Sequence, residues 1–586
     1  MNIIGFFQGM DPAACVIQEG RLVAYVEEER LVRVKHAAGM FPIRSIEFCL
    51  KKARLRISDI DCFAVGWDVP RYSNGGMQAF YERVNTLHPP DDATLRWQRH
   101  NIGWFQEDRF QELVRRQILG FFGADAPRVR FYPHHASHAV TAFFSSPLEE
   151  ALVFTVDGSG DSQCATFWHG RGSKIDPLDQ IEIPHSLGWF YSAMTEYLGF
   201  QAYDGEYKVM GLAAFGQPHK GFRRLLAEVL RPGPHGWDYE LDPKYIHHGP
   251  HTWSDRFTDC LVTHLGIPPR VGSAPLTPEY ESLAFEVQHA LETHAFRLLR
   301  HFREKTGLTN LCMAGGVALN VKLNSLIHRS GLFEQLFIFP VPSDSGTSIG
   351  AALGIYNLET GLRPLPLDHV FLGPSFTDAE IELQLRSCGL KYETCADISD
   401  RAAGLIAEGK VVGWCQGSLE GGPRALGGRS ILADPRHVSS RDRVNSAIKF
   451  REYWRPFCPS LTIESIGRFC KKPTAAPFMI LAFEATDEAR EKIPATVHVD
   501  GTMRVQTVDR ASNPRYHALL ESLDRKIGVP VVLNTSFNIK GEAIVSSPRD
   551  CLRTFFSTGI DALVLGSFLI EKPSEALPIK PEDLIR

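Results

Sequence analysis

Short apolar runs that end in glycine turns recur through the first three-fifths of the chain. ALVFTV at 151–156 and NLCMA at 310–314 have the length of buried strands, and glycine turns follow both. Between them, apolar residues at helical spacing predict a long amphipathic helix over 279–305. The same spacing at 41–55 predicts a helix near the N-terminus. Strands that alternate with helices predict an α/β fold.

A proline-rich stretch divides the chain into two parts. RPLPLDHVFLGP contains three prolines and is typical of a linker. A chain of 586 residues is also too long for a single hydrophobic core. We therefore predict an N-terminal domain over 1–362, a linker over 363–375 and a C-terminal domain over 376–586. Within the first domain, 72–119 and 231–275 lack clear periodicity and are predicted to be insertions, the former a helical region or a lid.

The composition is that of an ordinary globular protein, with 44% hydrophobic and 22% charged residues. A formal net charge of -5 and a pI near 6.5 provide no general attraction to nucleic-acid phosphates. The 12 cysteines include no C-x-x-C pair, which favours a reduced, intracellular protein. The N-terminus lacks a signal-peptide pattern, and no stretch reaches the roughly 18 apolar residues of a membrane span. We therefore predict a cytoplasmic protein that has no membrane partner.

Two histidines and two aspartates form a candidate metal site. In PHHASHAV, His134 and His138 are four residues apart and would lie on one face of a helix. Asp157 and Asp344 each follow an apolar run and precede a glycine turn, so both are expected at strand ends. Two imidazoles and two carboxylates suit a divalent first-row metal, and this ligand mixture does not identify which one. Taken alone, such a histidine pair is more often a pair of packed or surface residues.

Glycine turns after the predicted strands are candidates for phosphate contacts. Such turns expose backbone N–H groups, and a following helix adds a potential that favours anions. A set of several, two of them with aspartate, is typical of the nucleotide cleft of actin-like and chaperone ATPases. Glu206 and Lys208 in GEYKVMG could contact ribose or phosphate, or could form an ion pair at the start of a helix. The candidate nucleotide contacts are Gly158, Glu206, Lys208, Gly315, Gly316 and Asn320.

Basic residues are concentrated in three stretches of the second half. EGGPRALGGRSILADPR, IKFREYWRPFCPS and MRVQTVDR all place arginines or a lysine close to glycine, proline or a predicted strand. The strand VVLNTSFN ends in asparagine, threonine and serine. Guanidinium and ammonium groups that converge with hydroxyls and amides would bind a small dianion. Any one of these arginines, taken alone, could equally be a solvated surface charge.

Several motifs together resemble one enzyme family. They are EEERLVRVKH, HHASHA, DGSGDS, GEYKVMGLAAFG, GGVALN, PSDSGTSIGAA, GPRALGGRS, the K-x-R-E-x-W-R-P segment and NTSFN. With these motifs the chain resembles the NodU/CmcH-type O-carbamoyltransferases over nearly its full length. The resemblance implies an N-terminal ASKHA (actin-like ATPase) domain similar to the tRNA threonylcarbamoyl transferases, followed by a YrdC-like α/β domain.

The resemblance also implies a reaction. The YrdC-like domain would convert carbamoyl phosphate and ATP, with Mg²⁺, into carbamoyl adenylate. The N-terminal domain would then transfer the carbamoyl group to a hydroxyl of a small-molecule acceptor. The acceptors of this family are sugars and other natural products, antibiotics among them, and the sequence does not reveal which one this chain uses.

The site residues of the family match positions in this sequence. The metal ligands fall on His134, His138, Asp157 and Asp344, and the family metal is ferrous iron. The contacts to carbamoyl phosphate and adenylate fall on Arg424, Lys449, Arg455, Arg504, Asn534 and Ser536. Of these, Arg424, Lys449 and Arg504 are the expected catalytic residues.

One position departs from the family pattern. Where the family has a histidine before the first aspartate, this chain has Met10, followed by Asp11 and Pro12. A thioether neither takes up a proton nor donates a hydrogen bond at neutral pH. If that histidine activates the acceptor, Asp11 or His36 is the expected substitute.

Three other kinds of protein share parts of this pattern. A tRNA-modifying threonylcarbamoyl transferase would share the N-terminal features, but the acidic net charge and the second half count against it. Hydrogenase-maturation carbamoyltransferases share both halves but carry C-x-x-C zinc pairs, which this sequence lacks. A nucleotide-switched binding protein would have no use for the basic second half. We expect ATP, carbamoyl phosphate and a hydroxylated small molecule as ligands, no nucleic acid, and a homodimer, for which no specific residue pattern argues.

Overall fold

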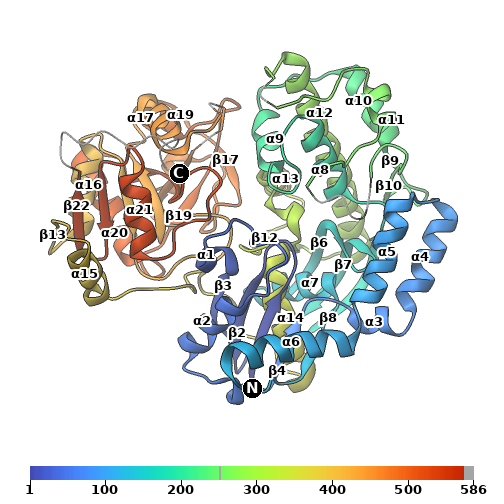
Figure 1. The fold of residues 1–586 in the computed structure, drawn as a ribbon. Helices are drawn as coiled ribbons and strands as arrows, with labels where there is room; N and C mark the ends of the chain where they lie inside the picture. Colours follow the sequence, from blue (N-terminus) through green and yellow to red (C-terminus); the bar gives the residue numbers. More distant parts are fainter. Residues whose placement is uncertain (248, 250–252, 273, 453, 456, 573–586) are drawn as a thin grey trace. The chain divides into compact units, whose positions relative to one another are not determined.

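The computed structural model describes residues 1–247, 249, 253–272, 274–452, 454–455 and 457–572 (Figure 1). Contacts between residues divide the chain into two compact units. The first comprises Met1–Ala24 and Gly39–Leu367, and the second comprises Tyr25–Ala38 and the chain from Asp368 onward. The short segment Tyr25–Ala38 thus belongs to the second unit, although the residues on both sides of it belong to the first. The end of the predicted C-terminal domain, 573–586, lies outside the described residues.

One sheet of the first unit is built around the N-terminal strand. Its strands, in the order β3-β2-β1-β4-β5, are β1 (Asn2–Phe7), β2 (Ala13–Gln18), β3 (Arg21–Glu27), β4 (Cys62–Val65) and β5 (Val129–Phe131). Strand β1 pairs antiparallel with β2 and parallel with β4. Helices α2 (Ile43–Ala53) and α6 (Glu107–Phe122) pack their apolar side chains into the core beside this sheet. Helix α2 confirms the predicted helix at 41–55.

A second sheet carries the predicted strands that end in glycine turns. Its strands, in the order β12-β11-β6-β7-β8, are β6 (Glu150–Gly160), β7 (Gln163–Arg171), β8 (Lys174–Glu182), β11 (Asn310–Ala314) and β12 (Gln335–Ile338). Strand β11 pairs parallel with both β6 and β12, so the carboxyl ends of the three strands lie at one edge. The strands predicted at 151–156 and 310–314 are therefore confirmed. Helix α7 (His134–Phe144) packs against β6 and β11, and α14 (Thr347–Thr360) packs against α7.

The remaining helices of the first unit include one long helix and several short ones. Helix α12 (Pro278–Thr306) confirms the prediction at 279–305. The predicted insertion at 72–119 is helical, since it contains the end of α3 (Val69–Ser73), all of α4 (Gly76–Leu87) and α5 (Asp92–Trp104), and most of α6. The insertion at 231–275 holds most of β9 (Leu230–Pro232), β10 (Tyr239–Leu241) and α11 (Asp259–Leu265). The other helices are α8 (Leu187–Tyr197), α9 (Glu206–Leu212), α10 (Lys220–Val229) and α13 (Val321–Ser330).

The second unit is built on an eight-stranded mixed sheet with the order β13-β22-β21-β14-β15-β20-β16-β19. Its strands are β13 (Glu393–Thr394), β14 (Val412–Cys415), β15 (Arg429–Ala433), β16 (Cys458–Thr462), β19 (Gln506–Val508), β20 (Val531–Ser536), β21 (Ala562–Leu565) and β22 (Phe568–Glu571). A separate pair consists of β17 (Ala482–Glu484) and β18 (Thr502–Arg504). Residues alternate along β21, where Ala562 and Val564 face one core and Leu563 and Leu565 face the other.

Helices cover both faces of that sheet (Figure 1). Helices α16 (Ile398–Ala407) and α20 (Pro514–Ile527) supply one core, and α15 (Asp378–Ser387) and α21 (Pro548–Phe556) supply the other. Shorter helices are α1 (Glu28–Val32), α17 (Val438–Val444), α18 (Ile466–Phe469) and α19 (Asp487–Lys492). The whole chain is mixed α/β, as predicted. Within the described residues, every helix is too short or too polar to span a bilayer.

Candidate functional site

Four side chains predicted to bind a metal converge in the first unit. One ligand atom from each of His134, His138, Asp157 and Asp344 lies within 4.8 Å of all the others. The two Nε2 atoms are 3.2 Å apart, and Nε2 of His138 is 3.0 Å from Oδ2 of Asp157. Oδ1 of Asp344 is 3.6 Å from Nε2 of His134 and 3.8 Å from that of His138. Ligand atoms around one cation, each about 2.0–2.2 Å from it, have separations in this range.

The local fold explains why these side chains meet. The first turn of α7 presents His134 and His138 on one face, while Asp157 lies near the carboxyl end of β6 and Asp344 begins the turn before α14. Gly160 makes the approach of α7 feasible, because a Cβ atom there would be 1.9 Å from Cδ2 of His134. Gly160, the second glycine of DGSGDS, thus has a packing role in addition to its place in the turn.

Neighbouring groups orient the cluster. The Nδ1 atom of His134 is 3.2 Å from the carbonyl oxygen of Gly66, so Nδ1–H can donate and leave Nε2 free to coordinate. The backbone N–H of His134 donates to Asp161 at 2.9 Å, and that carboxylate also accepts from the N–H of Asp68 at 3.1 Å. Asp161, the second aspartate of DGSGDS and not one of the predicted site residues, therefore fixes the start of α7.

The charges of the cluster are strongly interdependent. Burial opposes the charged form of His134, but Asp157 and Asp344 outweigh it and raise the pKa of His134 to about 10. Burial likewise opposes ionisation of Asp157, yet the two histidines hold the pKa of that carboxyl well below its ordinary value. A buried pair of carboxylates thus demands positive charge from protons or a cation. The four residues fit a divalent metal ion, and their mixed nitrogen and oxygen donors do not identify which one.

His135, between the two candidate ligands, does not join them. Its Nδ1 atom is 2.7 Å from Oγ1 of Thr155, and its Nε2 atom is 3.1 Å from the carbonyl oxygen of Gln163. Burial, with the two neighbouring histidines, lowers the pKa of His135 well below its ordinary value. It packs as a neutral side chain against β6 and β7.

The glycines predicted to contact a nucleotide lie beside the metal cluster. Gly315 has φ +95° and a Cβ there would be 2.2 Å from the carbonyl oxygen of Val156, so β11 can turn only with glycine. A Cβ on Gly316 would be 2.9 Å from Oδ1 of Asp157. Gly158 donates its N–H to that same oxygen at 2.7 Å. A ligand bound at this edge would therefore be close to the cation site.

The polar residues predicted for the same nucleotide have structural partners. The carboxylate of Glu206 accepts from the N–H groups of Tyr203 and Gly205 and from Oγ of Ser192, which anchors the start of α9. Asn320 is the N-cap of α13, since its Oδ1 accepts from the N–H of Leu323. Their nucleotide contacts, and that of Lys208, whose Nζ lies 5.5 Å from the centre of the Phe200 ring, stay predictions.

The two expected substitutes for the missing histidine lie in different units. Asp11 is in the first unit, where its Oδ2 accepts from the phenol of Tyr203 at 2.9 Å. Burial, then Asp11 and Asp344, raise the pKa of Tyr203 well above its ordinary value. His36 is in the second unit, and its N–H donates to Glu29 at 2.8 Å. Asp11 is thus the one of the two that shares a compact unit with the metal cluster.

In the second unit, Lys449 is the centre of a polar cluster. A π-helical turn (Asn445–Lys449) brings this buried ammonium group to the end of β20. Nζ lies 2.7 Å from Oδ1 of Asn538, 3.0 Å from its carbonyl oxygen, and 3.1 Å from Oγ of Ser536. Burial lowers the pKa of Lys449 well below its ordinary value, and Arg451 and Arg455 act in the same direction. Such π-turns and perturbed groups are common at functional sites.

The loop that carries Arg424 is fixed from within by Glu420. The Oε1 atom of this buried carboxylate accepts from the N–H of Leu426 at 2.6 Å and from those of Gly428 and Arg429 at 3.2 Å. Asn534 also holds the loop, since its Nδ2 donates to the carbonyl of Ala425 at 3.0 Å. Asn534 is almost fully buried, so the structure shows a supporting role, while a direct ligand contact stays a prediction.

The other basic residues of the second unit differ in their surroundings. Arg504 donates from Nε to Sγ of Cys458 at 2.9 Å, and Arg455 is 3.6 Å from Glu452. Arg429 is fully buried and donates to the backbone carbonyls of Pro374, Gln416, Gly417, Gly428 and Ser546. Two arginines of one glycine-rich stretch thus have different surroundings, because Arg429 is buried among backbone carbonyls and Arg424 is half-buried.

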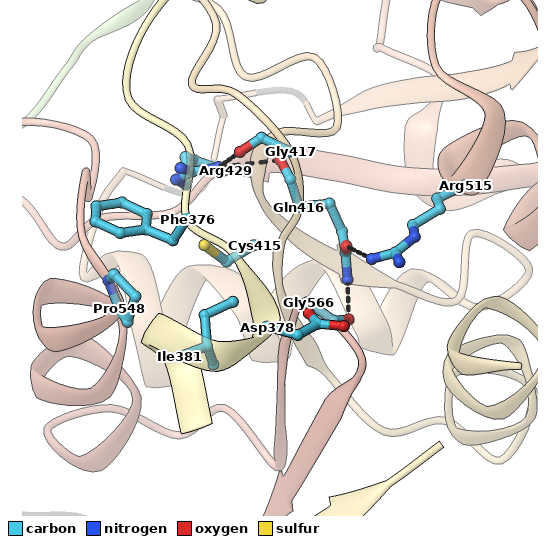
Figure 2. Close-up of a pocket in the computed structure, with 10 residues that line it drawn as sticks. All are labelled: Phe376, Asp378, Ile381, Cys415, Gln416, Gly417, Arg429, Arg515, Pro548 and Gly566. Carbon is cyan, nitrogen blue, oxygen red and sulfur yellow. Dashed lines mark hydrogen bonds between the residues drawn. The ribbon is translucent and has the colours of Figure 1, made fainter. Parts of the chain in front are cut away.

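A cavity of about 280 Å³ lies in the second unit (Figure 2). Gln416 crosses it, accepting from Nη1 of Arg515 at 2.8 Å and donating to the carbonyl of Gly566 at 2.7 Å. Phe376, Ile381 and Pro548 form its apolar side. None of the residues predicted to bind carbamoyl phosphate or ATP lines it.

Two family descriptions match most of the chain. "Carbamoyltransferase N-terminus" matches residues 3–353, and "Carbamoyltransferase C-terminus" matches residues 403–572. The nodulation protein NolNO of Sinorhizobium fredii (strain NBRC 101917 / NGR234) is 37% identical over 587 residues, covering 98% of this chain and 80% of that protein. NolO of Bradyrhizobium diazoefficiens is 40% identical over 456 residues, covering 76% and 79%. Nodulation protein U of Rhizobium tropici is 27% identical over 571 residues, covering 92% and 91%.

Solved structures resemble this one only weakly. Component A of (R)-2-hydroxyglutaryl-CoA dehydratase from Acidaminococcus fermentans gives a TM-score of 0.33 at 13% identity, covering 61% of this chain and 98% of that one. HypF from T. kodakarensis gives a TM-score of 0.31 at 12% identity, covering 62% and 48%. Similarity at this level supports no fold assignment.

Proposed function

Since this chain belongs to the carbamoyltransferase family, we propose that it is an ATP-dependent O-carbamoyltransferase whose two half-reactions use different units. The N-terminal unit would be an ASKHA-type transfer domain and the C-terminal unit a YrdC-like domain that forms carbamoyl adenylate. The observation that carries this proposal is the presence of two chemically distinct sites. One is a buried histidine–aspartate group suited to a cation, and the other is a lysine–arginine region suited to a dianion.

The C-terminal unit would activate the donor. Carbamoyl phosphate and one water would give carbamate and phosphate, and the carbamate would attack the α-phosphorus of Mg²⁺-bound ATP to give carbamoyl adenylate and pyrophosphate. Lys449, Arg424 and Arg504 would hold the anions, and the carbonyl and hydroxyl groups of Ser536 and Asn538 would direct the ammonium group. Burial disfavours a charged Lys449, so the arrival of a dianion would restore the ammonium and couple binding to proton uptake.

The N-terminal unit would transfer the carbamoyl group. His134, His138, Asp157 and Asp344 would hold the cation, which when bound supplies Lewis-acid polarisation of a carbonyl group. Asp11 would accept the proton of the acceptor hydroxyl, and the Tyr203 phenol that donates to it would hold its carboxylate in place. The turn at Gly315 and Gly316 would bind the adenylate through the N–H of Gly316, because that of Gly315 donates to the carbonyl of Pro342 at 2.8 Å. Ferrous iron is the proposed metal by family resemblance alone.

The proposed acceptor is a hydroxyl of a sugar or another natural product, including antibiotics. Trp97, Tyr81 and Phe105 of the helical insertion pack in one cluster with Trp189, so they serve the core of that region. The acceptor class therefore rests on the family and not on these aromatic residues.

The proposal is tested by incubating the protein with ATP, carbamoyl phosphate and a panel of hydroxylated acceptors. We expect pyrophosphate release that depends on carbamoyl phosphate, and the gain of one carbamoyl group by an acceptor, both followed by mass spectrometry. ATP binding without such release would favour a nucleotide-switched binding protein. Binding of tRNA that weakens steeply with salt would favour a tRNA-modifying enzyme.

A further inference from the structure

The segment Tyr25–Ala38, named the inserted segment below, builds part of the second unit. It contains the end of β3 and helix α1, and it carries the motif EEERLVRVKH. Its flanking residues belong to the first unit, so the chain enters the second unit once near its N-terminus and again after Leu367. The division of labour proposed above gives α1 no role.

Two side chains of the inserted segment hydrogen-bond to Gly422, a residue of the loop that carries Arg424. These two contacts are called the Gly422 contacts below. Oε1 of Glu27 accepts from the N–H of Gly422 at 2.6 Å, and Nη2 of Arg30 donates to the carbonyl of Gly422 at 3.0 Å. Both polar groups of this residue are therefore held by an ion pair, in which Nε of Arg30 is 3.6 Å from Oε2 of Glu27. Nη1 of Arg30 also lies 3.1 Å from Glu29.

Burial makes the Gly422 contacts depend on the ion pair between Glu27 and Arg30. The side chains of Arg30 and Glu27 are only 5% and 8% exposed, so each charge is tolerated only while its partner is present. Burial opposes the charge on Arg30, but Glu29, Glu27 and then Glu420 outweigh it and raise the pKa of this guanidinium. Arg30 and its neighbouring carboxylates are buried together, so one arrangement of these side chains has the lowest energy. That arrangement includes their hydrogen bonds to Gly422.

The Gly422 contacts lie close in sequence to Arg424, a predicted catalytic residue. Gly422 precedes Arg424 by two positions, and Glu420 holds the N–H groups of Leu426, Gly428 and Arg429 on the other side. Arg424 therefore lies between two anchored stretches of backbone. Without the outer anchor, Gly422 would lose both backbone partners, while the contacts of Glu420 and of Asn534 on the far side of Arg424 would remain.

A second arginine of the inserted segment holds the other half of the dianion site. Arg33 has φ +62°, unusual for this residue type, and donates to the carbonyl of Ala543 at 2.9 Å and to that of Ile544. This stretch follows Asn538, which accepts from Lys449 and donates from Nδ2 to the carbonyl of Glu542 at 2.7 Å. The inserted segment thus contacts both loops that carry the predicted donor-binding residues.

We infer that Glu27 and Arg30 are positioning residues for carbamoyl phosphate: by fixing the Gly422 peptide they hold Arg424 where it meets the dianion. This inference rests on the proposed function. It means that the donor-activating site is assembled from two parts of the chain nearly 400 positions apart, as the 395-residue separation of Glu27 and Gly422 shows.

The test compares R30K and E27Q with R436K in the full-length protein. Lysine keeps the charge but loses the planar fork, and glutamine keeps an acceptor for the Gly422 N–H but loses the pair. Arg436 is the matched control, because it forms a close ion pair with Asp434, at 2.8 Å, in the same unit but outside the loop. Two quantities are measured, the KM and kcat of pyrophosphate release at varied carbamoyl phosphate, and amide hydrogen exchange in peptides covering 420–429.

We expect R30K and E27Q to raise the KM for carbamoyl phosphate about tenfold with kcat changed less than about threefold. Exchange of the 420–429 amides should become about tenfold faster, and R436K should change neither quantity. Unchanged amide hydrogen exchange over 420–429 in both variants would show that the Gly422 contacts do not hold the loop. Faster exchange with an unchanged KM, or equal effects in R436K, would overturn the positioning role. A wild-type protein without pyrophosphate release would instead refute the proposed function, and with it the positioning role. Amide hydrogen exchange would still decide whether the Gly422 contacts hold the loop.

Discussion

The Nε2 atoms of His134 and His138 face each other at 3.2 Å inside the first unit. Two neutral imidazoles with both of these nitrogens as acceptors would repel, so the pair requires a shared proton or a cation between them. Asp157, 3.0 Å from His138, and Asp344 provide the negative charge that either choice needs. The four side chains therefore form a candidate metal site, in which a cation or a shared proton would relieve this repulsion.

Removal of one ligand should separate the two half-reactions. We expect H138A to lose bound metal and to slow carbamoyl transfer more than about 100-fold, the upper end of what changes outside the ligand sphere cost. Carbamoyl-phosphate-dependent pyrophosphate release should stay near that of the wild type. Metal content by elemental analysis and both rates are measured, with H169A as control, because His169 pairs with Glu150 at 2.8 Å outside the cluster.

The carboxylate behind the cluster should tune it without binding the metal. D161N keeps the shape of Asp161 but weakens its acceptance of the His134 N–H. We expect the dissociation constant for divalent metal to rise about 10- to 100-fold. Metal titration of chelator-treated protein measures this, and D179N, a change at a partly exposed carboxylate of β8, is the control. An unchanged metal affinity in D161N would refute the orienting role.

Gly160 should tolerate no side chain. In G160A the new Cβ would overlap His134, so the free energy of unfolding should fall by about 1–3 kcal/mol and metal binding should weaken. G103A is the matched control, because nothing lies within 4 Å of that helical position and alanine there should stabilise by about 0.5–1 kcal/mol. Urea unfolding of both variants gives these values. Equal stability of G160A and the wild type would mean that α7 is not packed as described.

The buried Lys449 should leave a signature in the pH dependence of stability. Its pKa is lowered in the folded protein, while the unfolded chain binds the proton up to about 10.5, so the unfolded state holds more protons between those values. Stability contributed by this group must therefore rise with pH in that interval. We expect the difference in unfolding free energy, wild type minus K449M, to increase from neutral pH toward 10.5 in urea titrations. A difference that is constant or decreases with pH would contradict the lowered pKa.

Local sequence patterns predicted much of the fold and one site. Strands such as 151–156 and the helix at 279–305 follow from apolar spacing, which short-range packing preserves. The four candidate metal ligands could be predicted because His134 and His138 share one helical face and Asp157 and Asp344 both precede glycine turns.

Long-range packing could not be read from the sequence in this way. Nothing in EEERLVRVKH indicates that Glu27 and Arg30 bind Gly422, because the partner residues are separated by most of the chain. Arg424 and Arg429 stand in one glycine-rich loop, and only their surroundings show that Arg429 is buried among carbonyl groups. Asp161 likewise became visible only once α7 and β6 were placed together.

The central claim is that donor activation and carbamoyl transfer use separate sites. The most direct measurement is the parallel assay of pyrophosphate release and acceptor carbamoylation in wild type, H138A and K449M, each with ATP, carbamoyl phosphate and the acceptor panel. The account predicts that H138A retains pyrophosphate release and loses carbamoylation, whereas K449M loses both. Loss of both activities in a correctly folded H138A variant, with K449M also inactive in both assays, would contradict the use of separate sites.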